Sequence, residues 1–220
     1  MNDILVTGAR GFMGSRLCEM LAEKGVDFKT FNHSQGDVAK YDFKDYNVKH
    51  IFHFAGKSFV PESWGIPAEY CEQNVMGLVN VLEYCRRTNA SLTFVSSYLY
   101  GNPDHLPVNE SAPKIALNPY ALTKLVGEEI CEFYRKSFNV NITIFRAFNV
   151  YGPGQKDFYL IPTVLNQLLN KDCDEVKVMD LSPKRDYIFI DDVIDAMITA
   201  YEKQIYSTYN LGFGKSVSVE

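Results

Sequence analysis

The sequence predicts an α/β fold, a doubly wound parallel sheet with a small, partly truncated C-terminal lobe. Short apolar runs alternate with longer segments of helical period, which is the pattern of βαβ units. A glycine-rich turn directly follows the first apolar run, and the regular alternation ends near residue 151. We therefore expect one domain over residues 1–150 and a partial lobe over 151–220, with a strand and a helix that return to the first domain.

Each element has its own signal. Ile4–Thr7 is a short buried strand, and 12–24 is a helix because its apolar residues recur at helical spacing before Gly25, a C-terminal stop. The other elements expected in the first domain are strands at 26–31, 50–54, 91–96 and 141–145 and helices at 68–87 and 120–138. Those expected in the lobe are a helix at 161–169, a strand at 176–179, a helix at 191–201 and a strand at 209–211.

Composition and charge narrow the class of protein. The 220 residues are 46% hydrophobic and 22% charged, which suits a globular chain with a sizeable core. A net charge of −5, with no basic run longer than Arg86-Arg87, argues against nucleic acid or an anionic membrane as partner. The five cysteines are scattered without CxxC spacing, so neither a metal site nor disulfides are expected. No apolar run approaches the ~20 residues of a membrane helix, and we expect a cytoplasmic protein.

The turn after the first strand has a G-x-x-G-x-x-G spacing. Such glycines permit a tight turn and let backbone N–H groups and the helix N-terminus approach a pyrophosphate. A purely structural turn is the alternative, but a strand before it and a helix after it favour dinucleotide binding in a Rossmann-like fold. The candidate cofactor-binding residues of this turn are Gly8, Arg10, Gly11, Phe12, Met13 and Gly14.

The end of the second strand bears on the choice of nicotinamide cofactor. NAD selection usually needs a carboxylate there, whereas this chain reads Asn32-His33-Ser34. Arg10 lies in the glycine turn, where its guanidinium can meet a 2′-phosphate unless it is simply a solvated surface residue. The sequence thus favours NADP over NAD. Asp37, next to Val38, is either an acceptor for the adenine amino group or a turn aspartate.

A candidate catalytic group lies at the start of the helix expected at 120–138. Tyr120 and Lys124 are four residues apart and therefore share one helix face. A cation beside a tyrosine lowers its pKa from ~10 toward working pH, so the phenolate can take a proton from a hydroxyl or return it to a carbonyl. Ser96 ends the preceding strand, where its hydroxyl can bond the same reacting oxygen. Ser97, the next residue, fits the role of a structural serine in the turn that ends this strand.

Several ordered motifs resemble the extended short-chain dehydrogenase/reductases that act on nucleotide-sugars, also called the NAD-dependent epimerase/dehydratase family. The resemblance covers essentially the whole chain. Its carriers are the glycine turn, His53-Phe54-Ala55-Gly56, Asn74-Val-Met-Gly, Ser96 to Gly101, Asn118-Pro119-Tyr120 to Lys124, Arg146 to Gly154, and Arg185-Asp186-Tyr187. The resemblance implies a triad of Ser96, Tyr120 and Lys124, with Tyr120 as acid/base and Lys124 also holding the nicotinamide ribose.

The resemblance also implies single contacts. Phe54, Ala55 and Gly56 would line the cofactor past the third strand, and Asn74 would help order the active-site backbone or water. A buried amide that bridges loops is the alternative for Asn74 and for Asn149. The candidate substrate-binding residues are Ser97, Tyr98, Asn149 and Arg185, the last as the cation that grips a pyrophosphate.

The same resemblance narrows the reaction. In the 4,6-dehydratases that the chain resembles, the residue after the catalytic Ser or Thr is often Asp or Ser, and the next is Glu. Ser97 and Tyr98 occupy these two positions here, so dehydration is disfavoured. Reduction of a 4-keto-sugar and 4-epimerisation remain, both by hydride transfer at sugar C4 of a nucleotide-diphosphate sugar. A homodimer is implied, paired through the helices at 68–87 and 120–138. The alternatives are a non-catalytic, redox-sensing dinucleotide binder of the same fold and a catalytically impaired fragment, because family members usually continue beyond such an ending.

Overall fold

The computed structural model describes residues 3–219. Its strands are β1 (Ile4–Thr7), β2 (Phe28–Phe31), β3 (His50–His53), β4 (Ser91–Ser97), β5 (Ile142–Ala147), β6 (Asn149–Tyr151), β7 (Lys184–Phe189), β8 (Thr208–Leu211) and β9 (Ser216–Ser218). Its helices are α1 (Phe12–Glu23), α2 (Val60–Ser63), α3 (Pro67–Cys71), α4 (Gly77–Thr88), α5 (Pro119–Phe138), α6 (Leu160–Leu169) and α7 (Ile190–Glu202), with a 3₁₀ turn at Phe43–Asp45 and a π-helical turn at Glu72–Met76.

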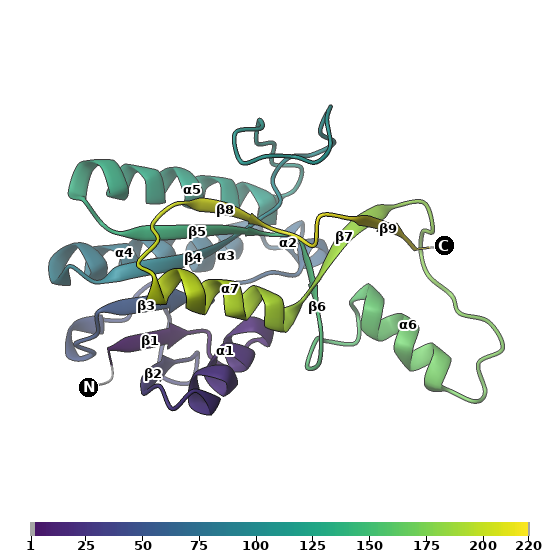
Figure 1. Cartoon of the computed structure of the whole chain (residues 1–220), viewed down its shortest axis with the longest axis horizontal. Helices are drawn as coiled ribbons and strands as arrows, with labels where there is room; N and C mark the ends of the chain where they lie inside the picture. The colour runs from purple at the N-terminus through teal and green to yellow at the C-terminus, as the bar shows by residue number, and fades with distance from the viewer. Residues whose placement is uncertain (1–2, 220) are drawn as a thin grey trace.

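Six parallel strands form the main sheet, in the order β2-β1-β3-β4-β5-β8 (Figure 1). The chain leaves β1 toward β2 on one side and then continues through β3 on the other. Open α/β sheets bind ligands outside the carboxyl ends of the strands at such a reversal. The doubly wound, Rossmann-like sheet predicted from the sequence is confirmed.

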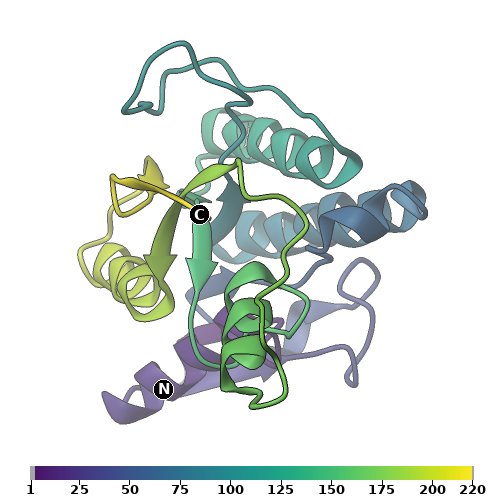
Figure 2. The same ribbon diagram turned by 90° about the vertical axis from the view of Figure 1, so that its right-hand side faces the viewer.

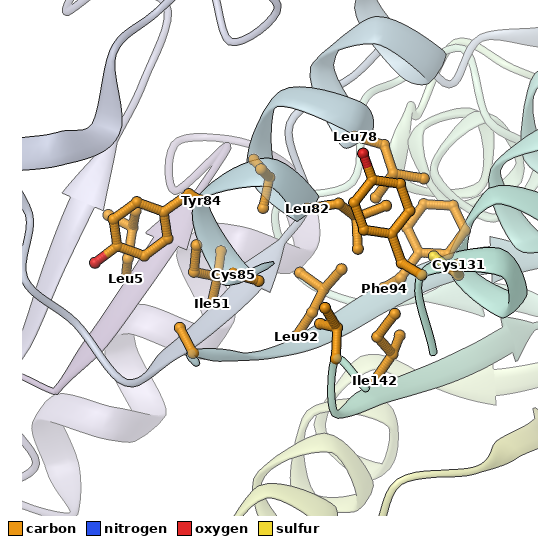
Figure 3. Packing of buried hydrophobic residues seen from close by; sticks show 14 of the residues in the cluster. Leu5, Ile51, Leu78, Leu82, Tyr84, Cys85, Leu92, Phe94, Cys131 and Ile142 are labelled. Atoms are coloured by element: carbon orange, nitrogen blue, oxygen red, sulfur yellow. The ribbon is translucent and has the colours of Figure 1, made fainter. Parts of the chain in front are cut away.

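Helices cover both faces of this sheet, with α7 on one side and α4 and α5 on the other (Figure 2). Side chains therefore alternate between two cores along each strand. Phe94 of β4 packs in the core beneath α4 and α5, together with Leu78 and Leu82 (Figure 3). Its neighbour Val95 packs in the opposite core with α1 and α7. This alternation decides where the serines at the end of β4 point.

The C-terminal lobe contains a second sheet, β6-β7-β9, and helix α6, which lies apart from the main sheet (Figure 1). The strand predicted at 176–179 is wrong, because these described residues form an irregular segment. The strand of the lobe is instead β7, which starts with three charged residues that are partly or fully exposed and so lacks an apolar signal. Helix α7 and strand β8 return to the first domain, where β8 pairs with β5.

The helix predicted at 68–87 is interrupted. The π-helical turn lies between α3 and α4, and single π turns widen a helix locally, often at functional sites. Asn74 occupies the middle of this turn and is buried. The turn thereby aims a polar side chain from the helix layer toward the loop that follows β3.

Two buried histidines of β3 couple stability to pH. His50 Nδ1 lies 2.7 Å from Ser91 Oγ, and His53 Nδ1 lies 2.9 Å from Thr7 Oγ1. Burial lowers the pKa of both imidazoles to about 3, with a further contribution from Lys124 at His53. An unfolded histidine titrates near ~6.5. Below that pH the unfolded chain takes up protons that the folded chain refuses, so stability falls as the pH drops.

We expect the free energy of unfolding to fall by about 3 kcal/mol between pH 7.5 and 5.5, since each histidine contributes about 1.4 kcal/mol per pH unit below its unfolded pKa. Urea unfolding at the two pH values measures this loss. His50→Gln keeps a polar side chain beside Ser91 but does not titrate in this range, so it should halve the pH dependence. An undiminished dependence in that variant would assign the effect to other groups.

Candidate active site

The glycine turn between β1 and α1 packs directly on the loop after β3. Gly8 has a φ of +69°, and a Cβ there would lie 2.7 Å from the backbone nitrogen of Ala55. A Cβ on Gly14 would lie 2.3 Å from the carbonyl oxygen of Gly8, so both positions require glycine. The N-cap of α1 is Gly11, which leaves the first N–H groups of the helix open to an anion. This cradle fits a dinucleotide pyrophosphate.

A cavity of about 640 Å³ extends from this cradle along the end of β2. Its size lies in the range of small-molecule sites. The structure brings together most of the residues predicted to hold the cofactor, namely Gly8, Arg10, Gly11, Asn32, His33, Ser34, Val38, Phe54, Ala55 and Gly56. Phe12, Met13 and Gly14 line the neighbouring cleft instead.

The polar residues at the end of β2 have different tasks. Asn32 Oδ1 accepts a hydrogen bond from the backbone N–H of Arg10 at 2.9 Å, which ties β2 to the glycine turn. The Asp37 carboxylate accepts from the backbone N–H of Ala39 at 2.9 Å and from Gln73 at 3.1 Å. The Ala39 bond is the main cause that lowers the pKa of Asp37. Both bonds go to Asp37 Oδ1 and build the turn, and the contact with the adenine amino group stays a prediction.

A second cleft of about 870 Å³ lies over the carboxyl ends of β4 and β5 and reaches into the lobe. It adjoins the first cavity along a shared wall made of Arg10, Gly11, Phe54, Gly56 and Lys57. The predicted site residues that line it include Ser96, Ser97, Tyr120, Lys124, Asn149 and Arg185.

Helix α5 delivers Tyr120 and Lys124 to this cleft from its first two turns. The helix starts with Pro119, and the side chain of its N-cap Asn118 accepts from the backbone N–H of Ala121 at 2.7 Å. Lys124 Nζ donates to the Val95 carbonyl at 2.8 Å and lies 5.8 Å from the centre of the Tyr120 ring. The phenol and the ammonium are thus neighbours at the end of β4.

The pKa values of this pair are set chiefly by burial. Burial lowers the pKa of Lys124 to about 8 and raises the pKa of Tyr120 above its ordinary value. The Ser97 side chain has the opposite effect and lowers the pKa of Tyr120. The lowering of the Tyr120 pKa that the sequence predicted is therefore wrong for the polypeptide alone, because burial raises this pKa.

The two serines at the end of β4 point to opposite faces of the strand. Ser96 is buried on the face of Phe94, and its hydroxyl donates to Glu128 Oε1 of α5 at 2.6 Å. Ser97 projects to the other face and lines the same cleft as Tyr120. Because the Ser96 hydroxyl is engaged by Glu128, the role predicted for Ser96 is proposed below for Ser97, which the sequence suggested as a turn serine or substrate contact. The period of two along β4 was the available signal, since Phe94 and Ser96 share a face.

Asn74 lies behind the loop after β3. Its side chain accepts from the N–H of Lys57 at 2.7 Å and donates to the carbonyl of Lys57 at 3.0 Å and to Thr123 Oγ1 at 2.9 Å. A Cβ on Gly56 would meet the Asn74 amide oxygen at 2.6 Å. Asn74 thus joins the loop to α5 as a buried bridge, and its part in ordering the active-site backbone for a cofactor stays a prediction.

The predicted substrate residues frame the lobe side of the cleft. Asn149 donates to the backbone carbonyl of Asp186 at 3.0 Å, and the Tyr98 hydroxyl lies 3.4 Å from Asn149 Oδ1. Tyr98 stacks on Phe148 at 5.5 Å, behind the cleft wall. Arg185 presents an exposed guanidinium that donates to the Lys184 carbonyl at 3.1 Å. Asn149 and Arg185 therefore face the same cleft as Tyr120.

Sequence reasoning missed Lys57, a cation on the wall between the two cavities. Its ammonium lies 3.6 Å from Glu62, 3.4 Å from Glu69 and 5.7 Å from the centre of the Tyr70 ring. The only signal was its place directly after Gly56. It also missed the aromatic wall formed by Phe158 and Tyr159 before α6.

Two further properties hold over residues 3–219. Within this range, His, Cys, Asp and Glu side chains do not gather in groups suited to a metal ion. Over the same residues, each helix is too short or too polar to cross a membrane.

The fold and the glycine cradle define the class of Rossmann-like dinucleotide-binding proteins. Within this class, a model of the NAD dependent epimerase/dehydratase family matches residues 4–212. The chain belongs to this family, and the resemblance inferred from its motifs is confirmed.

Relatives agree with this membership. A putative UDP-glucose 4-epimerase of Methanocaldococcus jannaschii is 31% identical, over 98% of this chain and 78% of the relative. The solved structure of MoeE5 in complex with UDP-glucose and NAD is 28% identical with a TM-score of 0.88, and covers 99% of this chain and 78% of that one. The NAD-dependent NDP-hexosamine 5,6-dehydratase TunA is also 28% identical, with a TM-score of 0.90 over 100% of this chain and 78% of its own.

Proposed function

We propose that the protein transfers hydride at C4 of a UDP-sugar and thereby epimerises it. The observation that carries this proposal is the position of Tyr120. Its phenol lies beside Lys124 and Ser97, on a cleft that adjoins the dinucleotide cavity. A tyrosine here can exchange a proton with a sugar oxygen while hydride moves at the carbon that bears it. The UDP-sugars named for the relatives support this substrate class.

The chain's own residues divide the task. Tyr120 acts as the phenolate: it takes the proton from the C4 hydroxyl and becomes the phenol, and it later returns that proton to the C4 oxygen. The Ser97 hydroxyl bonds the same oxygen, and the Lys124 ammonium stabilises the phenolate form of Tyr120. A nicotinamide held along the glycine turn and beside Lys124 would supply the acceptor and donor for the hydride. Asn149 and Arg185 hold the sugar nucleotide, with the Arg185 guanidinium on its pyrophosphate.

Parts of the sequence prediction remain proposals. Residues 1–150 would serve the cofactor and the chemistry, and 151–220 the sugar nucleotide. A homodimer through α4 and α5 is supported by the exposed Leu122 and Phe133 of α5. A cytoplasmic location rests on the sequence alone. Dehydration is not proposed, because Ser97 and Tyr98 offer no carboxylate at the end of β4.

The test is to incubate the purified protein with UDP-glucose, UDP-galactose and their N-acetyl forms, each with NAD and with NADP. Chromatography of the sugar nucleotides should show interconversion of one 4-epimer pair. Absence of both turnover and nicotinamide binding would overturn the proposal. Consumption of NADPH with a 4-keto-sugar would instead establish reduction, the second candidate.

Reduction is favoured by one observation, the exposed Arg10 on the cavity wall beside His33 and Ser34, where the end of β2 carries no acid. This arrangement suits the 2′-phosphate of NADP. We expect Arg10→Ala to raise the Kd for NADPH by about 10- to 100-fold, because charge-assisted bonds contribute about 1.5–3 kcal/mol. The Kd for NADH should change by less than about 3-fold. Nicotinamide fluorescence titrations give both constants, and equal effects would show that Arg10 does not contact a 2′-phosphate.

A further inference from the structure

A buried ion pair lies directly behind the end of β4. Glu128 of α5 and Arg146 of β5 are 1% and 5% exposed, and the guanidinium bonds the carboxylate through Nε at 3.0 Å and Nη2 at 2.8 Å. Ser96, 2% exposed, donates its hydroxyl to the same carboxylate at 2.6 Å. Burial alone would raise the pKa of Glu128, but the bonds from Arg146 and Ser96 keep it below its ordinary value. The carboxylate is therefore an ionised anchor for Ser96.

Glu128 and its partner Arg146 make further polar contacts. Lys114 Nζ lies 3.2 Å from Glu128 Oε2. Arg146 Nη1 donates to the Tyr100 hydroxyl at 2.7 Å and to the Glu110 carbonyl at 2.8 Å. These contacts join α5, β5 and the loop after β4. A buried polar cluster in which every group is hydrogen-bonded is rigid and favours a single side-chain arrangement.

The anchor shares its helix with the reacting tyrosine. Tyr120, Lys124 and Glu128 are spaced four residues apart on α5 and so lie along one stripe of the helix. Glu128 holds Ser96 on the α5 face of β4, and strand geometry then directs Ser97 to the other face. Lys124 also contacts β4, through the Val95 carbonyl at 2.8 Å. One helix thus carries Tyr120 and also braces the end of β4 that carries Ser97.

We propose that Ser96, anchored by Glu128, is a positioning residue that keeps Ser97 directed into the cleft that Tyr120 also lines. Its effect on turnover rests on the proposed function, whereas its effect on the Tyr120 environment does not. The Ser96 hydroxyl donates its proton to Glu128 and so is not free to donate to the reacting oxygen. It acts through Ser97 alone.

A double-mutant cycle tests the proposal in turnover. Ser96→Ala removes only the hydroxyl and leaves the ion pair in place, so the fold should survive. We expect kcat to fall about 10-fold with the KM for the sugar nucleotide within about 2-fold, since small misplacements of reacting groups act on the chemical step. Ser97→Ala should lower kcat about 100-fold, as loss of one donor to the reacting oxygen does. In the Ser97→Ala background, Ser96→Ala should add less than about 2-fold.

A second readout is independent of turnover. In protein labelled with ¹³C at the tyrosine Cζ, the Tyr120 resonance is assigned by its loss in Tyr120→Phe. Ser96→Ala should shift this resonance in the wild-type background and leave it in place in the Ser97→Ala background. An unmoved resonance in the single variant, or equal shifts in both backgrounds, would overturn the positioning role. Lack of turnover in the wild type would instead overturn the proposed function, and the resonance cycle would still decide this inference.

Discussion

Replacement of Tyr120 by phenylalanine should lower turnover by about 10²- to 10⁴-fold, the usual contribution of a positioned acid/base. The ring keeps its place over Lys124, whose ammonium lies 5.8 Å from the ring centre, so only the hydroxyl is lost. Binding of the nicotinamide cofactor should therefore stay within about 2-fold of the wild type. Steady-state rates on the active UDP-sugar, together with a fluorescence titration of the cofactor, measure both quantities.

Tyr134→Phe is the matched control for this variant. Tyr134 lies in the last turns of α5, and its hydroxyl donates to Glu83 at 2.7 Å, far along the helix from the cleft. Loss of that hydroxyl should leave turnover unchanged while costing a modest amount of stability. Wild-type turnover in Tyr120→Phe would refute the assignment of Tyr120 as the acid/base.

Glu128→Gln should lower the free energy of unfolding by about 3–5 kcal/mol at pH 7.5, the usual result when one partner of a buried ion pair loses its charge. The side chain of Glu128 is 2% exposed, and that of Arg146 is 6% exposed. The amide of glutamine fills the same space but leaves the guanidinium uncompensated. Urea denaturation at constant pH gives the difference directly.

Glu129→Gln provides the comparison, because Glu129 is the next residue on α5 and also pairs with Lys114, at 2.7 Å. Its side chain is 65% exposed, so its loss should cost less than about 1 kcal/mol. Similar losses in the two variants would mean that the buried pair contributes no more than a surface one. Adding Arg146→Met to Glu128→Gln should recover much of the stability, because no buried charge then remains unpaired.

The sheet and the cofactor cradle were predictable because their physical demands are visible in single residue types. A strand buried on both faces, such as β1, is expected to be a largely apolar run. Gly8 and Gly14 are required where backbone segments touch. The motif around Tyr120 and Lys124 was equally readable, since a spacing of four fixes a shared helix face.

Features that depend on partners distant in sequence were not predictable in the same way. Strand β7 has a charged first half, which is extended because it pairs with β9, while β6 pairs with its second half. The strand period could place Ser96 and Ser97 on opposite faces, but it did not reveal that Ser96 bonds Glu128, which lies 32 positions beyond it. The raised pKa of Tyr120 reflects packing around the phenol, and sequence spacing reveals only the nearby cation.

The wall shared by the two cavities makes their occupants thermodynamically linked. Arg10, Gly11, Phe54, Gly56 and Lys57 belong to both boundaries, so the first ligand to bind settles side chains that the second must meet. If a bound dinucleotide changes the affinity for a sugar nucleotide by some factor, a bound sugar nucleotide must change the affinity for the dinucleotide by the same factor. A substitution of Lys57 would then change the coupling between the two affinities as well as each affinity alone, and the protein would behave as one two-ligand receptor.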